Sequence, residues 1–151
     1  MTIEGVFSAC NLIAMGGWIL LLTVPRNRRA MTIAGTVIPL TLAVIYLTLF
    51  ALHARESSGG FSSLAAVAQL FANQWLLLAG WVHYLAFDLF IGAWETRDAM
   101  ARRMPHLILA PCLVMTFLLG PIGLLGYHLV RARADEPLDG AVLPPMPKAH
   151  R

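Results

Sequence analysis

The chain has 151 residues, of which 58% are hydrophobic and only 13% are charged, and its mean hydropathy is +0.70. About a quarter of the residues of an ordinary soluble domain are charged, so this composition excludes such a domain. The formal net charge of +3 does not indicate a nucleic-acid partner, because no basic patch is interleaved with exposed stacking aromatics.

Four apolar segments follow one another along the chain, at residues 5–24, 31–52, 75–94 and 107–130. Each reaches the roughly 20 residues that a helix needs to cross a bilayer. Asp88 is the single Asp, Glu, Lys or Arg within the four. The sequence therefore predicts an all-α fold, an integral membrane bundle of four transmembrane helices, within residues 1–133. Residues 134–151 lack apolar periodicity and are predicted to form a disordered tail.

The connections between these segments are short, and their arginines indicate an orientation. Three arginines lie in residues 25–29 and three in residues 95–106, whereas residues 54–63 hold only Arg55. Because Lys and Arg concentrate in cytoplasmic loops, we expect the two basic connections in the cytoplasm and both termini outside. Residues 63–74 have apolar side chains at helical spacing, which predicts an amphipathic lead-in to the third span.

The third span carries the ionisable residues that point to chemistry. Asp88 and His83 lie near its middle, where a charged side chain costs about 2.5–3.5 kcal/mol on insertion scales. Such residues are usually retained for a function, so we predict both as catalytic; a hydrogen bond to a neighbouring helix is the structural alternative for each. At about 100° per residue the two side chains point about 140° apart. They can therefore line two sides of a cavity or serve two different interfaces.

Further polar and aromatic side chains are candidates for a ligand contact. The predicted substrate-binding residues are Asn11, Trp18, Trp81, Tyr84 and Phe87. The alternative for each is helix packing, because membrane helices commonly use such groups between them.

Two glycines of the third span have the same two interpretations. Gly80 and Gly92 lie about 18 Å apart along the helix. They suit either close helix packing or a groove for a flat, elongated apolar molecule. We predict such a groove, open to lipid, with Asp88 near one end of the bound ligand.

A family resemblance rests mainly on this third span. The segment reads Gly80-Trp-Val-His-Tyr-Leu-Ala-Phe-Asp-Leu-Phe-Ile-Gly92, followed by Arg97-Asp98. It resembles the neoxanthin-synthase-like family, whose plant members are the abscisic-acid-deficient membrane proteins of plastids. Asn11 with Trp18 and Pro25, and the closing Thr116-Phe-Leu-Leu-Gly-Pro-Ile-Gly123, also agree, so the resemblance covers roughly residues 7–130. The chain lacks the plastid transit extension of the plant members, and we therefore expect a bacterial relative in an inner membrane.

The resemblance implies carotenoid or related isoprenoid chemistry. Plant members are required to convert violaxanthin, an epoxide, into the allenic neoxanthin, which is a redox-neutral isomerisation. It needs a proton delivered to the epoxide oxygen and a proton removed from the adjacent polyene carbon. Asp88 and His83 are side chains of the right types for an acid and a base.

Two alternatives to an isomerase remain open from the sequence. One is an accessory subunit that binds pigment or lipid without chemistry. The other is a haem- or metal-binding protein that would use His83 with His53, His106 or His128, although no metal-type spacing supports it. We expect no cofactor and no metal. The expected partners are the lipid bilayer and a carotenoid-like hydrophobic ligand, without nucleic acid, and a homo-oligomer is left open.

Overall fold

The computed structural model describes residues 2–135, and all regular secondary structure within them is helical, without a strand. The elements in chain order are α1 (Ile3–Thr23), α2 (Arg28–Thr32), η1 (Ile33–Val37), α3 (Ile38–His53), η2 (Ala54–Glu56), α4 (Leu64–Phe71), α5 (Gln74–Ala101), α6 (His106–Leu119) and α7 (Pro121–Asp135). The prediction of an all-α membrane bundle is confirmed. The predicted tail, residues 134–151, lies outside the described residues from 136 onward.

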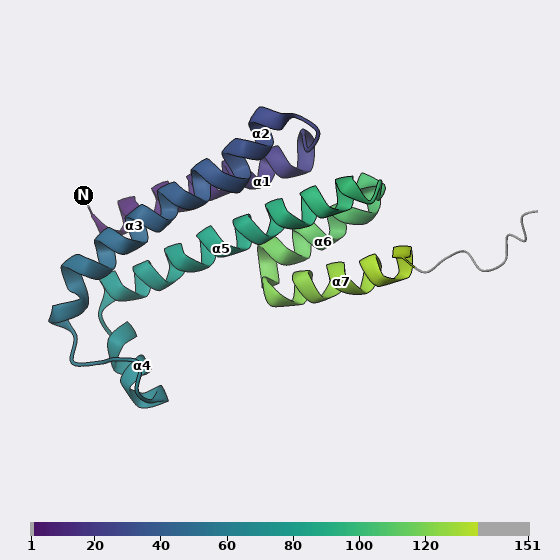
Figure 1. Ribbon diagram of the computed structural model, residues 1–151. Helices are drawn as coiled ribbons and strands as arrows, with labels where there is room; N and C mark the ends of the chain where they lie inside the picture. The colour runs from purple at the N-terminus through teal and green to yellow at the C-terminus, as the bar shows by residue number, and fades with distance from the viewer. Residues whose placement is uncertain (1, 136–151) are drawn as a thin grey trace, which may run out of the picture.

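Three helical rods in the described part of the chain are long and apolar enough to cross a membrane. They are α1, the continuous run Arg28–Glu56, and α5, which has 28 residues and is about 42 Å long. The three rods lie side by side, with α5 packed against the other two (Figure 1). The predicted amphipathic lead-in forms α4, which lies across the end of α3 and α5 (Figure 1).

The prediction that residues 107–130 form a fourth transmembrane helix is wrong. The segment breaks at Gly120, whose φ of 45° is outside the helical region, and Pro121 lacks the N–H that would continue α6. α7 then returns alongside α6 as a helical hairpin (Figure 1). α6 has 14 residues and is about 21 Å long, less than the roughly 30 Å of a hydrocarbon core. The hairpin therefore enters the bundle and leaves on the side from which it came.

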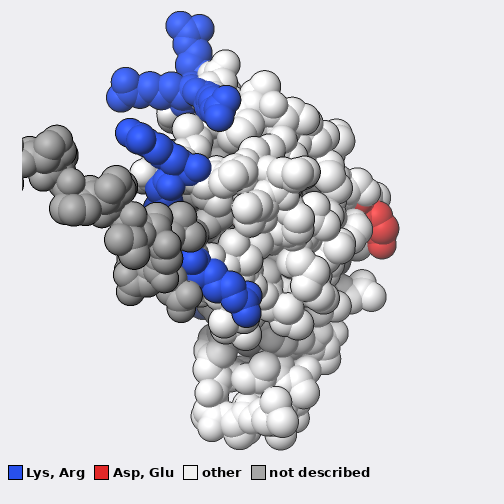
Figure 2. All heavy atoms as spheres, turned by 90° about the vertical axis from the view of Figure 1, so that its right-hand side faces the viewer, with Lys and Arg blue, Asp and Glu red and all other residues white. Residues whose placement is uncertain are grey.

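The hairpin also overturns the prediction that both termini lie on one side. With three crossings and one return, the start of α1 and the end of α7 lie at opposite ends of the molecule (Figure 1). Eight of the nine arginines within residues 2–135 lie at or near the end where α7 finishes, and only Arg55 lies at the other end. Figure 2 views the molecule from that basic end, with the arginine side chains gathered on one side of the face.

A π-helical turn, η1, marks the middle span. Pro39 lies at the start of α3, where it has no N–H to donate and its ring opposes the carbonyl four residues earlier, on Gly35. A wider turn relieves this conflict. It also sets Gly35 tightly against Ala93 and the guanidinium of Arg97 on α5, where a β-carbon would collide. The second span is thereby fixed in depth against α5.

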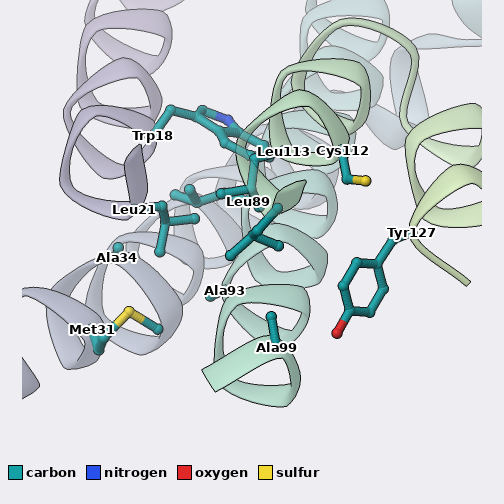
Figure 3. Packing of buried hydrophobic residues seen from close by; sticks show 11 residues of the cluster. Trp18, Leu21, Met31, Ala34, Leu89, Ala93, Ala99, Cys112, Leu113 and Tyr127 are labelled. Carbon is teal, nitrogen blue, oxygen red and sulfur yellow. The ribbon is translucent and has the colours of Figure 1, made fainter. Parts of the chain in front are cut away.

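The buried core is built around α5. One cluster joins it to α1, η1 and the hairpin, with Trp18 and Leu21 on one side and Leu113 and Tyr127 on the other (Figure 3). A second cluster joins the first half of α5 to α1 and α3 through residues such as Cys10, Leu42 and Val82. Cys10 and Cys112 are both free and buried, as expected of small packing residues. α5 is thus the helix that presents side chains to every other part of the fold.

Candidate functional site

Asp88 lies on the face of α5 that meets the elbow of the hairpin. Its side chain is only 8% exposed, and a β-carbon on Gly120 would stand 3.0 Å from both carboxyl oxygens. Glycine at the elbow therefore makes room for the carboxyl group. Oδ2 of Asp88 is buried without a hydrogen-bond partner among the described residues. A buried polar atom without a partner is unfavourable, and such atoms are rare outside functional sites.

Glu95, two turns further along the same stripe of α5, is fully buried. Its two carboxyl oxygens lie 3.0 and 3.1 Å from Oγ1 of Thr116 on α6, and Thr116 is fully buried as well. Sequence reasoning placed Glu95 in a loop, because the apolar window ends at Trp94, and did not predict it as a site residue. The helical stripe that contains Asp88 and Glu95 was the signal that could have found it.

Two more hydrogen bonds join α5 to the hairpin on either side of these carboxyls. The hydroxyl of Tyr84 donates to the carbonyl of Phe117 at 2.8 Å, and the hydroxyl of Tyr127 donates to Oδ2 of Asp98 at 2.7 Å. We call this row the α5–hairpin seam: Tyr84, Asp88, Glu95 and Asp98 on α5, with Thr116, Phe117, Gly120 and Tyr127 opposite. The seam leads from the interior of the bundle to the basic end.

An apolar groove of about 600 Å³ runs along the first half of α5, and we call it the α5 groove. It is lined by Ile3, Glu4, Phe7, Phe71, Gln74, Leu77, Leu78, Gly80, Trp81 and Tyr84. Trp81 donates its indole N–H to Oδ1 of Asn11 at 3.2 Å, so the predicted binding residue Asn11 fixes the ring that lines the groove. The groove ends at Tyr84, one helical turn before Asp88.

His83 lies on another side of α5 and is not brought together with Asp88. It packs against Tyr46, at 5.6 Å between ring centroids, and against Phe87, at 4.6 Å. With Phe50, Phe61 and others it lines a second, smaller pocket of about 210 Å³ beneath α4. Phe71 and Gly80 line both cavities, so the two lie next to each other. The predicted separation of His83 and Asp88 around the helix agrees with this placement.

Trp18, also predicted as a binding residue, lies in the buried core. It is 3% exposed and belongs to the core, where its ring packs on Phe117 at 5.5 Å between centroids (Figure 3). It does not contribute to the lining of the α5 groove or of the second pocket.

Two other histidines, His53 and His106, lie at the ends of helices, whereas His128 of α7 packs against Trp94. Nδ1 of His53 lies 2.8 Å from Glu56 and its ring stacks on Trp75, while His106 bonds the carbonyl of Leu22 at 2.8 Å. Within residues 2–135 no three His, Cys, Asp or Glu side chains converge to hold a metal ion.

These observations define an integral membrane protein with three spans and a hairpin that re-enters the bundle over a buried acidic seam, beside an apolar groove. The sequence model of the ABA DEFICIENT 4-like family matches residues 5–127, and the chain belongs to this family. The match confirms the resemblance to the neoxanthin-synthase-like proteins. No curated protein and no solved structure matches the chain. A bacterial origin, an inner-membrane location and a homo-oligomer stay predictions.

Proposed function

We propose that this protein is an isomerase of a carotenoid or related isoprenoid epoxide, with Asp88 as the proton-transfer group. The observation that carries the proposal is the buried, unpartnered carboxyl oxygen of Asp88, one helical turn beyond Tyr84, the last residue of α5 that lines the apolar groove. Helix packing alone does not require a carboxyl group at this depth, where its insertion is unfavourable.

The α5 groove supplies the binding surface for a polyene. From Gln74 to Tyr84 it extends about 15 Å along α5, and its lining is aromatic and aliphatic apart from Glu4 and Gln74 near its mouth. An apolar ligand that lies in the groove would direct one end toward Tyr84 and Asp88. Part of a longer ligand would extend past the groove into the surrounding lipid.

Asp88 can carry out both proton transfers of the isomerisation. Its neutral carboxyl donates a proton to the epoxide oxygen as the bond from that oxygen to the polyene-bearing ring carbon breaks. The carboxylate then removes the proton from the adjacent polyene carbon, and that electron pair forms the new double bond of the allene. Electrons and protons balance, the oxygen remains as a hydroxyl group on the other ring carbon, and Asp88 is regenerated.

His83 has a different place in this proposal from the one that the sequence indicated. It borders the second pocket, which shares Phe71 and Gly80 with the groove. We therefore propose that His83, with Phe87 beside it, contacts the part of the ligand that lies around the other side of α5. The variant His83→Ala should weaken ligand binding while Asp88 continues to transfer protons.

The test is turnover of an epoxy-carotenoid by the purified protein in lipid vesicles. With violaxanthin as the probe, the wild type should form an allenic product, and Asp88→Asn should lower its rate by about 10²–10⁴-fold while pigment binding persists. Glu56→Gln is the matched control, because Glu56 is an exposed carboxyl at the opposite end. Wild-type turnover in Asp88→Asn would reject the assignment of Asp88. Bound pigment without any turnover in the wild type would instead support the accessory subunit.

A further inference from the structure

The acidic residues of the α5–hairpin seam are spaced from the interior of the bundle to its basic end. Asp88, Glu95 and Asp98 follow one another at about 10 Å and then about 4.5 Å along the helix axis. Asp88 is 8% exposed and Glu95 is 0% exposed, whereas the Asp98 side chain is 20% exposed. The row therefore starts at a buried orphan oxygen and ends at a group that water reaches.

Glu95 is joined to the hairpin through the hydroxyl group of Thr116. Thr116 has a single hydroxyl proton, yet its Oγ1 is equally close to both oxygens of Glu95, at 3.0 and 3.1 Å. The hydroxyl group of Thr116 donates to the carboxyl group of Glu95. A carboxyl group can take up and release a proton, so Glu95 is a candidate proton carrier in this part of the seam.

The charged groups around the seam differ between its inner part, at Asp88 and Glu95, and its outer end, at Asp98. Arg102 and Arg131 contact Asp98, at 2.9 and 3.5 Å, and Asp98 also accepts from Tyr127, so this outer group is held as a carboxylate. No ion pair to Asp88 or Glu95 is found within residues 2–135. The remaining titratable groups that face the two are Tyr84 on α5 and Cys112 on α6.

We propose that the α5–hairpin seam is the path by which Asp88 exchanges its proton with water at the basic end, with Glu95 as the intermediate proton carrier. The inference rests on the proposed function only in taking Asp88 as the proton-transfer group. Asp88 and Glu95 are about 10 Å apart along the helix axis, so the proposed path requires water in the seam to bridge them. Polar atoms for such water are present in Oδ2 of Asp88 and the hydroxyl of Thr116.

The experiment is hydrogen–deuterium exchange of the Asp88 carboxyl group, followed by infrared spectroscopy on the full chain in lipid vesicles transferred to heavy water. The variant Asp88→Asn identifies the carboxyl band of Asp88. In Glu95→Gln the amide oxygen still accepts from Thr116, so the packing is preserved while the titratable group is lost. We expect Asp88 to exchange at least tenfold more slowly in Glu95→Gln than in the wild type.

A second pair of variants separates the path from a packing effect. Thr116→Val removes the hydroxyl and should slow exchange in the same way, and Thr116→Ser should restore it. Thr48→Val is the control, because the Thr48 hydroxyl bonds only to the Val44 carbonyl on the exposed side of α3. Equal exchange rates in Glu95→Gln and the wild type, or no Asp88 carboxyl band at any pH at which the protein stays folded, overturn the proposal. Slowed exchange in a protein that does not turn over violaxanthin would leave this path standing and reject only the proposed function.

Discussion

The ring of Trp18 lies directly on Gly92, so that a β-carbon on Gly92 would stand 2.6 Å from two ring carbons. This contact brings α1 and α5 together at the level of the core (Figure 3). From the sequence, Gly80 and Gly92 had the same two interpretations, helix packing or a ligand groove. In the structure the two glycines have different roles. Gly92 is a packing glycine, whereas Gly80 lines the α5 groove and the second pocket.

The first prediction follows from that difference. Gly92→Ala should destabilise the protein by about 1–3 kcal/mol, because the Trp18 ring is enclosed and cannot move aside. Gly80→Ala should cost less, since its β-carbon meets only the Phe71 ring at 2.9 Å, and Phe71 is an exposed side chain of α4. It should instead lower the amount of pigment bound. Thermal unfolding in detergent and the pigment absorbance of the purified variants measure the two effects. Equal loss of stability in both would contradict the distinction.

The second prediction concerns topology. Because the hairpin returns to the end where α5 finishes, reporters fused to the two termini should be found on opposite sides of the membrane. Because Lys and Arg concentrate on the cytoplasmic side of membrane proteins, we expect the arginine-rich end in the cytoplasm. The C-terminal reporter should therefore be cytoplasmic and the N-terminal reporter outside. Both reporters on the same side would mean that residues 107–130 cross the membrane as one helix.

The third prediction tests the elbow. Gly120 has a positive φ of 45° and lies against the Asp88 carboxyl group, so Gly120→Ala adds backbone strain and a close contact. We expect a loss of about 1–3 kcal/mol in the free energy of unfolding. Gly126→Ala is the matched control within α7, because nothing lies within 4 Å of its β-carbon position. It should be neutral or stabilising by up to about 1 kcal/mol. A harmless Gly120→Ala would argue against the broken helix.

The fourth prediction concerns the outer hydrogen bond of the seam. Tyr127 is fully buried and donates to the Asp98 carboxylate, a bond to a charged group that is worth about 1.5–3 kcal/mol. Tyr127→Phe should lower the free energy of unfolding by about this amount. Tyr46→Phe is the control, since the recorded contacts of Tyr46 are to the rings of Phe50 and His83. Chemical unfolding measures the free energy of unfolding of both variants. Similar losses in the two would mean that the hydrogen bond to Asp98 does not contribute the expected stability.

The periodic features of the chain could be predicted from the sequence. The apolar windows that became α1, the run Arg28–Glu56 and α5 were recognisable because hydrophobic length has a direct physical threshold. The position of Asp88 was predictable for the same reason, as the one carboxyl group within those windows. The separation of Asp88 and His83 around the helix followed from helix geometry alone.

The hairpin could not be predicted in the same way, because a window of hydrophobicity does not report the direction of the chain. Gly120 and Pro121 indicated a kink, but a kink and a reversal use the same residues. Only the packing of Gly123 against Thr116 and of Gly120 against Asp88 decides between them. Glu95 was missed for a related reason: its burial depends on Thr116 from the hairpin, 21 residues further along the chain.

The break at Gly120 has an electrostatic consequence for Asp88. α7 begins at Pro121, and the first peptide units of a helix leave their N–H groups unpaired, which gives its start about half a unit of positive charge. The Asp88 carboxyl group stands at this helix start, beside Gly120. Burial favours the neutral form of the group, whereas the peptide dipoles of α7 favour the charged form. An uninterrupted fourth span would have offered only the first of these influences. The reversal of the chain thus places the positive end of a helix dipole beside Asp88, which a straight fourth span would not do.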